Sequence, residues 1–253
     1  MQRYKIIVAY DGTDYFGWQV QKESLSVAQV LQDTFNSVFK KDISLLGASR
    51  TDAGVHALGQ VATFTTDLAI PPVTMLQAWN NLLPPDIVIR SLEEVPDDYS
   101  PHKNVHYKTY WYHFFMQRPL PFTQRYGWHY RYPVDLKKLQ ECFKVFIGTH
   151  DFRSFCTGDD MGDDTIRLID SITLEYLPEY NAYRIAITGP RFLRYMIRRI
   201  VGACLEVASR DHLTLDYLKQ VLEEKNPEHT LPNAPAKGLM LSVIVYKGED
   251  DAF

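Results

Sequence analysis

The sequence is short of cysteine, of net charge and of long apolar runs. Its 253 residues include three cysteines, Cys142, Cys156 and Cys204, widely spaced and in neither a Cys-x-x-Cys pair nor a Cys/His cluster. This pattern indicates neither a disulfide framework nor a zinc site, so we expect reduced, mostly buried thiols. No apolar run approaches the roughly 20 residues of a membrane span, and the first residues lead into a strand rather than a signal peptide. We therefore expect a cytoplasmic protein with no membrane partner.

The formal net charge of −4 by itself argues against a nucleic-acid partner, because phosphate binding depends on Lys and Arg. Charge is unevenly distributed, however. Acidic residues gather at Asp159, Asp160, Asp163, Asp164 and in the tail 249–251, whereas Arg191, Arg194, Arg198 and Arg199 fall within nine residues. A local basic surface therefore remains possible. The acidic stretch does not have the spacing of a calcium loop, so we expect a solvated loop and no metal.

Hydrophobic residues make up 45% of the chain and aromatics 13%, enough for one large or two ordinary domains. Alternation predicts a strand at 4–10, and the capping-box spacing from Ser26 begins a helix. Strands on both sides of residues 47–60, a helix over 73–83 and a strand at 87–95 follow. The order strand, helix, strand, strand, helix, strand predicts a split βαβ, ferredoxin-like unit with an antiparallel sheet.

The polar, proline-bearing segment 96–104 marks a subdomain boundary, which divides the chain into halves 1–104 and 105–253. After it the pattern starts again. The second half is predicted to contain a long aromatic strand at 105–115, a helix at 136–146, strands at 166–177 and 183–188, helices at 191–209 and 215–222, and a strand at 239–245. The predicted class is therefore α+β, with two halves of related pattern.

Two loops of the first half hold residues suited to chemistry. The loop 13–23 contains Tyr15, Phe16, Trp18, Gln19 and Gln21, which could stack on bases and bond their edges or equally could pin the loop to the core. The loop 47–60 is polar and punctuated by glycine, with Asp52 at its centre between two strands. Asp52 could be an ordinary turn residue or a reactive carboxylate held by rigid elements.

The longer pattern distinguishes these readings of Asp52. The run Arg50-Thr51-Asp52-Ala53-Gly54-Val55-His56, the opening from Tyr10 through Gln21, the run Phe192 to Gly202, and Gly238-Leu239 with Leu241 occur in the order of one family. Together they resemble the tRNA pseudouridine synthase A family over roughly residues 4–246. The resemblance implies the pseudouridine synthase fold, with two ferredoxin-like halves meeting at a central cleft. It also implies a homodimer that acts without a cofactor on uridines near positions 38–40 of the tRNA anticodon stem-loop.

The same resemblance assigns roles to individual residues. Asp52 is implied as the catalytic carboxylate and Arg198 as its ion-pair partner. Tyr110 is implied to stack on the flipped base, with a possible relay of the C5 proton, although one more strand aromatic is the plain alternative. Arg50 could fill the space left by the extruded uridine, or be an exposed loop arginine. On a helix over 191–209, Arg191 and Arg194 share a face with Arg198, which suits RNA phosphates or a merely solvated surface.

Other functions stay open at this point. A non-catalytic RNA-binding module could have the same topology, but no aromatic RNP1 consensus appears on a central strand. An aspartate-dependent nucleoside hydrolase would need a water-positioning partner that the sequence does not reveal. The segment Pro101-His102-Lys103-Asn104 departs from the family pattern Ala-Arg-Phe-Ser. A paralogue acting on another RNA is therefore a further alternative.

Overall fold

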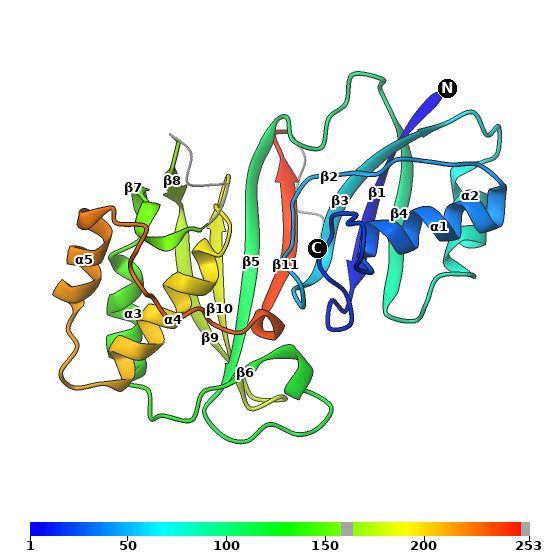
Figure 1. Ribbon diagram of the computed structural model, residues 1–253. Helices are drawn as coiled ribbons and strands as arrows, with labels where there is room; N and C mark the ends of the chain where they lie inside the picture. The colour runs from blue at the N-terminus through cyan, green and yellow to red at the C-terminus, as the bar shows by residue number, and fades with distance from the viewer. Residues whose placement is uncertain (158–163, 249–253) are drawn as a thin grey trace. The chain divides into compact units, whose positions relative to one another are not determined.

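The computed structural model describes residues 1–157 and 164–248, so residues 159–163 of the acidic stretch and the acidic tail lie outside the described residues. The chain folds into two compact units (Figure 1). Unit 1 contains Met1–His106 and the part of the chain from Met240, and unit 2 contains Tyr107–Leu239. Unit 1 has the elements β1 (Gln2–Tyr10), α1 (Val27–Phe39), β2 (Leu46–Gly47), β3 (His56–Thr66), α2 (Pro72–Asn80), β4 (Ile87–Val95) and most of β11 (Leu239–Tyr246).

Unit 2 contains the main part of β5 (Val105–Phe115) and the remaining elements of the chain. These are η1 (Gln124–Tyr126), β6 (Trp128–His129), α3 (Leu136–Lys144), β7 (Gly148–Asp151), η2 (Arg153–Phe155), β8 (Ile166–Ile169), β9 (Ser171–Leu177), β10 (Ala182–Gly189), α4 (Met196–Ser209), α5 (Leu215–Glu224) and η4 (Ala236–Gly238). The mixture of helices with mostly antiparallel strands confirms the predicted α+β class.

Unit 1 has the strand order of a ferredoxin-like sheet. β4, β1 and β3 are neighbours, and the short β2 pairs with the far side of β3, each pair antiparallel. Two βαβ units interleave in this way when the inserted strand runs antiparallel to both of its neighbours. The predicted split βαβ arrangement of the first half is therefore confirmed. β11 adds a short parallel pairing beside the start of β3.

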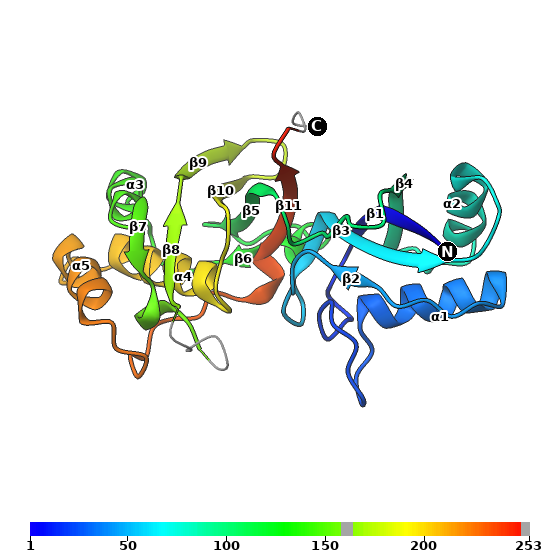
Figure 2. The ribbon, with the colours of Figure 1, turned by 90° about the horizontal axis from the view of Figure 1, so that it is seen from above.

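The helices of unit 1 lie next to one another on the sheet (Figures 1 and 2). The rings of Phe35 on α1, Trp79 on α2 and Phe64 on β3 contact one another with centroid distances of 4.8–5.5 Å. The Trp79 indole also donates to the Leu31 carbonyl at 3.1 Å, which satisfies its buried N–H. The capping prediction is correct, because the Ser26 side chain accepts from a backbone N–H of the first turn of α1.

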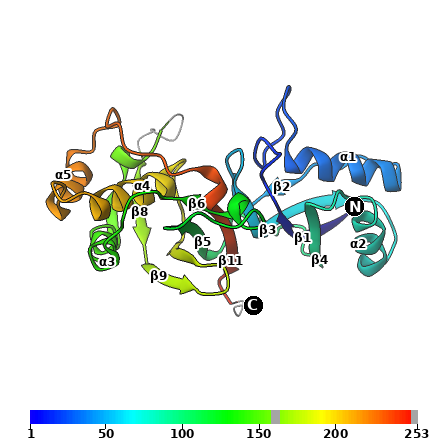
Figure 3. The same cartoon turned by 90° about the horizontal axis from the view of Figure 1, so that it is seen from below.

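In unit 2 the antiparallel strands follow the order β5-β10-β9, and β7 pairs with β8. Helices α3, α4 and α5 gather in one group (Figures 2 and 3). One face of the sheet presents Tyr112, Phe114 and Ile185, all fully buried, as the alternation of side chains along a strand requires. On the opposite face the Arg184 guanidinium lies 3.9 Å from the Trp111 ring centroid, a cation–π contact.

The strand expected over 166–177 is instead two strands, β8 and β9, because β8 pairs with β7 and β9 pairs with β10. Two further sequence predictions need revision. The helix expected over 191–209 begins only at Met196, because Tyr195 takes a left-handed backbone conformation with φ of 63° at the N-cap. The last strand, expected in the second half, has most of its length in unit 1, since it pairs with β3. The cysteine prediction is confirmed, because all three thiols are free and buried. Among residues 1–157 and 164–248, no helix is both long and apolar enough to cross a membrane.

Candidate functional site

In unit 1, Asp52 lies in the loop between β2 and β3, as the sequence predicts. Its side chain is half-buried, whereas Arg50 is exposed. The loop is closed from within by the Val55 N–H, which donates to the Asp52 carbonyl at 3.1 Å. This hydrogen bond makes the backbone at Asp52 part of a turn. It does not involve the carboxylate, whose role depends on the residues that hold and surround the loop.

The loop 11–18 is hydrogen-bonded to one side of the Asp52 loop. The Trp18 N–H donates to the Thr51 carbonyl at 3.2 Å, and the Gly54 N–H donates to the Tyr15 carbonyl at 3.1 Å. The hydroxyls of Tyr10 and Thr51 lie 2.7 Å apart. Bonds thus reach the Asp52 loop on both sides of the carboxylate, so its backbone position depends on a segment about forty residues earlier.

The aromatic loop 13–23 contains residues that fit each of its two interpretations, packing against the core and stacking on bases. Tyr15 and Trp18 are buried, at 5% and 1% exposure, and so pin the loop to the core. Phe16 is 57% exposed and stays available for stacking. Gly17 permits the close approach, because its φ is 86° and a Cβ there would lie 2.4 Å from the Thr51 carbonyl oxygen. Only glycine combines that backbone conformation with that contact.

His56 anchors the far end of the Asp52 loop, a role that the sequence analysis missed. Its buried Nδ1 accepts a hydrogen bond from the Gly12 N–H at 3.1 Å and lies 3.0 Å from an Asp11 carboxylate oxygen. That carboxylate accepts a hydrogen bond from the Thr13 backbone N–H at 3.0 Å. A histidine at the first position of an apolar strand was the available signal, since buried polar groups require partners.

Gln60 anchors the near end of the same loop. Its fully buried side-chain amide makes two bonds to the Ser49 backbone, accepting from the N–H at 3.2 Å and donating to the carbonyl at 2.6 Å. The Ala48 N–H donates to the Val61 carbonyl at 2.7 Å. The loop that holds Asp52 is therefore fixed at both ends and at its side, which suits a reactive group that must keep its orientation.

In unit 2, Tyr110 lies on β5 opposite Ile187 of β10. Its ring is 7% exposed and meets the ring of Phe192 edge-on, with centroids 5.4 Å apart and planes at 84°. Lys108 lies two residues earlier on the same strand, opposite Gly189. Burial, and then the positive charge of Arg191, lower the pKa of Lys108 to about 8. Lys108 did not emerge as a candidate from the sequence.

The predicted common helical face of Arg191, Arg194 and Arg198 is wrong, because the first two residues precede α4. Arg194 and Arg198 are instead related through a shared aromatic neighbour. The guanidinium carbons of Arg194 and Arg198 each lie 5.1 Å from the centroid of the Tyr195 ring. The ring of Tyr195 therefore makes a cation–π contact with each of the two arginines. Arg191 and Arg194 are exposed, and Arg198 is half-buried.

Arg198 is also held by the segment before η4. Its Nε donates to the Ala234 carbonyl at 2.7 Å, and the Ala234 N–H donates to the Arg198 carbonyl at 3.1 Å. The Tyr112 hydroxyl donates to the neighbouring Pro235 carbonyl at 3.0 Å. Burial raises the pKa of that hydroxyl well above its usual value, and the charge of Arg198 acts in the opposite direction. Arg198 and the buried Tyr112 are thus bonded to neighbouring carbonyls of the same segment.

Arg199 does not belong to a basic surface. Its guanidinium donates to the carbonyls of Cys156 at 2.9 Å and Ser154 at 3.3 Å, and burial lowers its pKa. We read it as a structural residue that joins α4 to η2. Of the four clustered arginines, only Arg191, Arg194 and Arg198 therefore remain candidates for a functional role.

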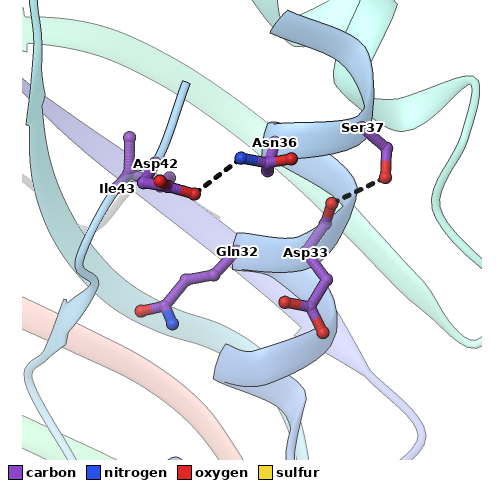
Figure 4. Close-up of a pocket in the computed structure, with 6 residues that line it drawn as sticks. All are labelled: Gln32, Asp33, Asn36, Ser37, Asp42 and Ile43. Atoms are coloured by element: carbon purple, nitrogen blue, oxygen red, sulfur yellow. Dashed lines mark hydrogen bonds between the residues drawn. The ribbon is translucent and has the colours of Figure 1, made fainter. Parts of the chain in front are cut away.

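A polar pocket beside α1 contains none of these residues (Figure 4). It is lined by Gln32, Asp33, Asn36, Ser37, Asp42 and Ile43. The Asn36 amide donates to the Asp42 carboxylate at 2.6 Å, and the Ser37 hydroxyl donates to the Asp33 carbonyl. An acidic lining does not suit RNA phosphates. No group of three or more metal-ligating side chains occurs in the described part of the chain.

Comparison with known proteins decides the family. The model of the tRNA pseudouridine synthase family matches residues 6–102 and 142–247. The chain belongs to the tRNA pseudouridine synthase family. The matched segments include Asp52 and Arg198 of the two motifs, whereas Lys108 and Tyr110 fall between them. The predicted family and the predicted enzyme class, an isomerase, are confirmed.

Three relatives illustrate the similarity, each named tRNA pseudouridine synthase A. The protein of Thermodesulfovibrio yellowstonii is 35% identical over 256 residues, which cover 97% of this chain and all of the relative. The protein of Limosilactobacillus fermentum is 35% identical and covers 97% of this chain and 96% of its own. The protein of Acetivibrio thermocellus is also 35% identical, with 97% and 100% covered. The similarity to these synthases thus extends over nearly the whole chain.

Proposed function

We propose that this protein converts uridine to pseudouridine in the anticodon stem-loop of tRNA, near positions 38–40, as a homodimer in the cytoplasm. The observation that supports this most is the Asp52 loop, whose residues match the family motif and whose backbone is held at both ends and from the side. A rigidly positioned carboxylate on an accessible loop is what a reaction at one sugar carbon requires.

The reaction breaks the bond between ribose C1′ and N1 of uracil, rotates the base and joins C1′ to C5. The proton on C5 leaves, and N1 gains a proton. Asp52 is proposed to act at C1′ or at the 2′ hydrogen, as nucleophile or as base. Arg198 is proposed as the cation that keeps this carboxylate ionised when substrate excludes water. The bond from its Nε to the Ala234 carbonyl supports a fixed rather than a mobile guanidinium.

Tyr110 is proposed to stack on the flipped uracil and to relay the C5 proton. Its edge-on contact with Phe192 supports a fixed ring orientation. Arg50, exposed two residues before Asp52, is proposed to occupy the space that the flipped uridine leaves in the stem. Arg191 and Arg194, both exposed, are proposed to contact RNA phosphates.

The decisive experiment maps pseudouridine by chemical probing in tRNA from cells with and without this protein. We expect signals near positions 38–40 to vanish in the deletion strain and to return with the wild-type gene. Loss of signals at other tRNA positions or in another RNA would instead identify a paralogue with a different substrate. In that case the exposed His102 and Lys103, which depart from the family pattern, become the first residues to exchange. The homodimer is tested by light scattering of the purified protein.

A further inference from the structure

Lys108 and Tyr110 are related by the geometry of β5. Side chains two residues apart on a strand lie on the same face, roughly 7 Å apart along it. The residue opposite Lys108 is Gly189, which has no side chain, and the chain then continues through Arg191 to Phe192, whose ring contacts Tyr110. The turn after β10 thus brings an arginine and an aromatic ring back to the same end of β5.

Two positive charges meet at this place. The charge of Arg191 acts directly on Lys108, and together with burial it lowers the pKa of the Lys108 ammonium to about 8. The surroundings therefore disfavour the charged lysine. The strand register places the backbone of Lys108 opposite Gly189, two residues before Arg191. A bound anion at this place would be attracted by both charges.

We infer that Lys108 and Arg191 together bind a backbone phosphate next to the uridine that stacks on Tyr110. The inference rests on the proposed function, because it takes from it that Tyr110 meets the flipped base. A flipped base remains attached through its ribose to two phosphates, so a phosphate can reach a cation that lies beside the stacking ring. Lysine supplies a compact charge and arginine a planar set of donors, a pairing suited to phosphate oxygens.

The test is a cycle of protein and RNA changes. Binding of an anticodon stem-loop RNA is measured in an Asp52→Asn background, which prevents turnover, with a neutral methylphosphonate replacing each phosphate that flanks the target uridine in turn. We expect the replacement at one of these positions to weaken binding by about 10-fold or more, the usual range for a lost hydrogen bond to a charged group. Lys108→Met should weaken binding to unmodified RNA by a similar factor.

Binding of the protein variants to the neutral RNA shows whether Lys108 contacts that phosphate. If Lys108 contacts that phosphate, Lys108→Met with the neutral RNA should bind no worse than either single change, and Arg191→Met should show the same lack of additivity at the same phosphate. Lys108→Arg should retain most of the affinity. Lys219→Met is the matched control, since Lys219 is an exposed lysine of unit 2 paired with Asp216, and it should change nothing. The proposal would be overturned if the losses from Lys108→Met and from the neutral phosphate multiply at both flanking positions. It would also be overturned if Lys108→Met leaves the affinity unchanged.

A separate activity assay distinguishes failure of the phosphate site from failure of the proposed function. Wild-type protein is assayed for pseudouridine in the unmodified stem-loop. Absence of product there contradicts the proposed function and withdraws the basis of the phosphate site. Product together with fully multiplicative losses contradicts the phosphate site alone. Should Lys108→Met fold poorly by circular dichroism, the phosphate scan with the wild type and with Arg191→Met still decides: the loss at one flanking phosphate should be smaller in Arg191→Met if the site exists, and the same in both proteins if it does not.

Discussion

The Gly54 N–H donates to the Tyr15 carbonyl at 3.1 Å, so the residue two positions after Asp52 is bonded directly to a loop from the beginning of the chain. Together with the bond from Trp18 to Thr51, this brackets the carboxylate between two contacts with the same loop. Substitutions in the loop 11–18 should therefore affect Asp52 without touching it. The predictions below separate the chemistry at Asp52 from the support that holds it.

Asp52→Asn should abolish pseudouridine formation and leave folding and RNA binding nearly intact. Asparagine has almost the same shape but is neither a base nor a nucleophile, so the loss should be in turnover rather than in affinity. Asp14→Asn, which neutralises an exposed carboxylate in the neighbouring loop, is the control and should remain active. Appreciable product from pure Asp52→Asn protein in a single-turnover assay would contradict the proposed mechanism.

Gly17→Ala should lower both stability and turnover, whereas Gly248→Ala should affect only stability, and slightly. Both glycines have φ of 86°, so each alanine carries a similar backbone penalty. A Cβ at Gly17 would lie 2.4 Å from the Thr51 carbonyl oxygen, but at Gly248 it would meet nothing within 4 Å. The difference between the two variants, measured by urea unfolding and by turnover, isolates the displacement of the Asp52 loop. Equal effects on turnover would show that the contact does not position the carboxylate.

Tyr110→Phe distinguishes stacking from proton relay. If the ring only stacks on uracil, phenylalanine preserves a contact worth roughly 1–3 kcal/mol per base and activity should survive. A hydroxyl that relays the C5 proton should cost about 10²–10⁴-fold in single-turnover rate when it is removed. We expect the larger loss, with deuterium at uridine C5 slowing the final step further. Full activity of Tyr110→Ala would remove this residue from the site.

Arg194→Ala should mainly weaken RNA binding, whereas Arg198→Ala should mainly reduce turnover. Loss of a phosphate contact at exposed Arg194 should weaken binding and reduce its salt slope by roughly one unit. Loss of Arg198, the proposed partner of Asp52, should reduce turnover more than binding. Arg199→Ala serves as a structural comparison, because its bonds go to the carbonyls of Ser154 and Cys156, and it should lower the unfolding midpoint without changing the slope. An unchanged slope in Arg194→Ala would mean a merely solvated arginine.

Lys108→Met should stabilise the protein at neutral pH while weakening RNA binding. Because the pKa of Lys108 is lowered from 10.5 to about 8, the folded state binds fewer protons than the unfolded state between these pH values. Stability of the wild type should therefore rise across that window, and the penalty should be present in full below pH 8. Discounted for solvent screening, we expect a midpoint higher by about 2–4 °C at pH 7 in the variant.

The advantage of Lys108→Met should shrink toward pH 10, as the wild-type lysine loses its charge. Thermal unfolding of both proteins at several pH values checks this, with Lys219→Met as the exposed control. A constant difference across the pH range would show that packing of the methionine, rather than removal of a disfavoured charge, causes the stabilisation.

Much of the fold follows from local sequence pattern. The strands Ile87–Val95 and Val105–Phe115 occur at the residues that alternation and aromatic content predict, and Ser26 caps α1 as its spacing indicates. These features depend on side-chain period and on bonds between residues close in the chain, which a sequence displays directly. Asp52 was likewise singled out as a candidate from the order of residues within one short segment.

Other features were decided only by tertiary structure. The apolar spacing after Arg191 is compatible with a helix, but Tyr195 adopts a left-handed conformation and α4 starts one residue later, which removes the expected arginine face. His56 and Lys108 acquire their importance from partners that the sequence does not place beside them: Gly12 and Asp11 for the first, Arg191 for the second. Burial and the field of a neighbouring charge depend on which distant segments pack together, and no local pattern of residues encodes that choice.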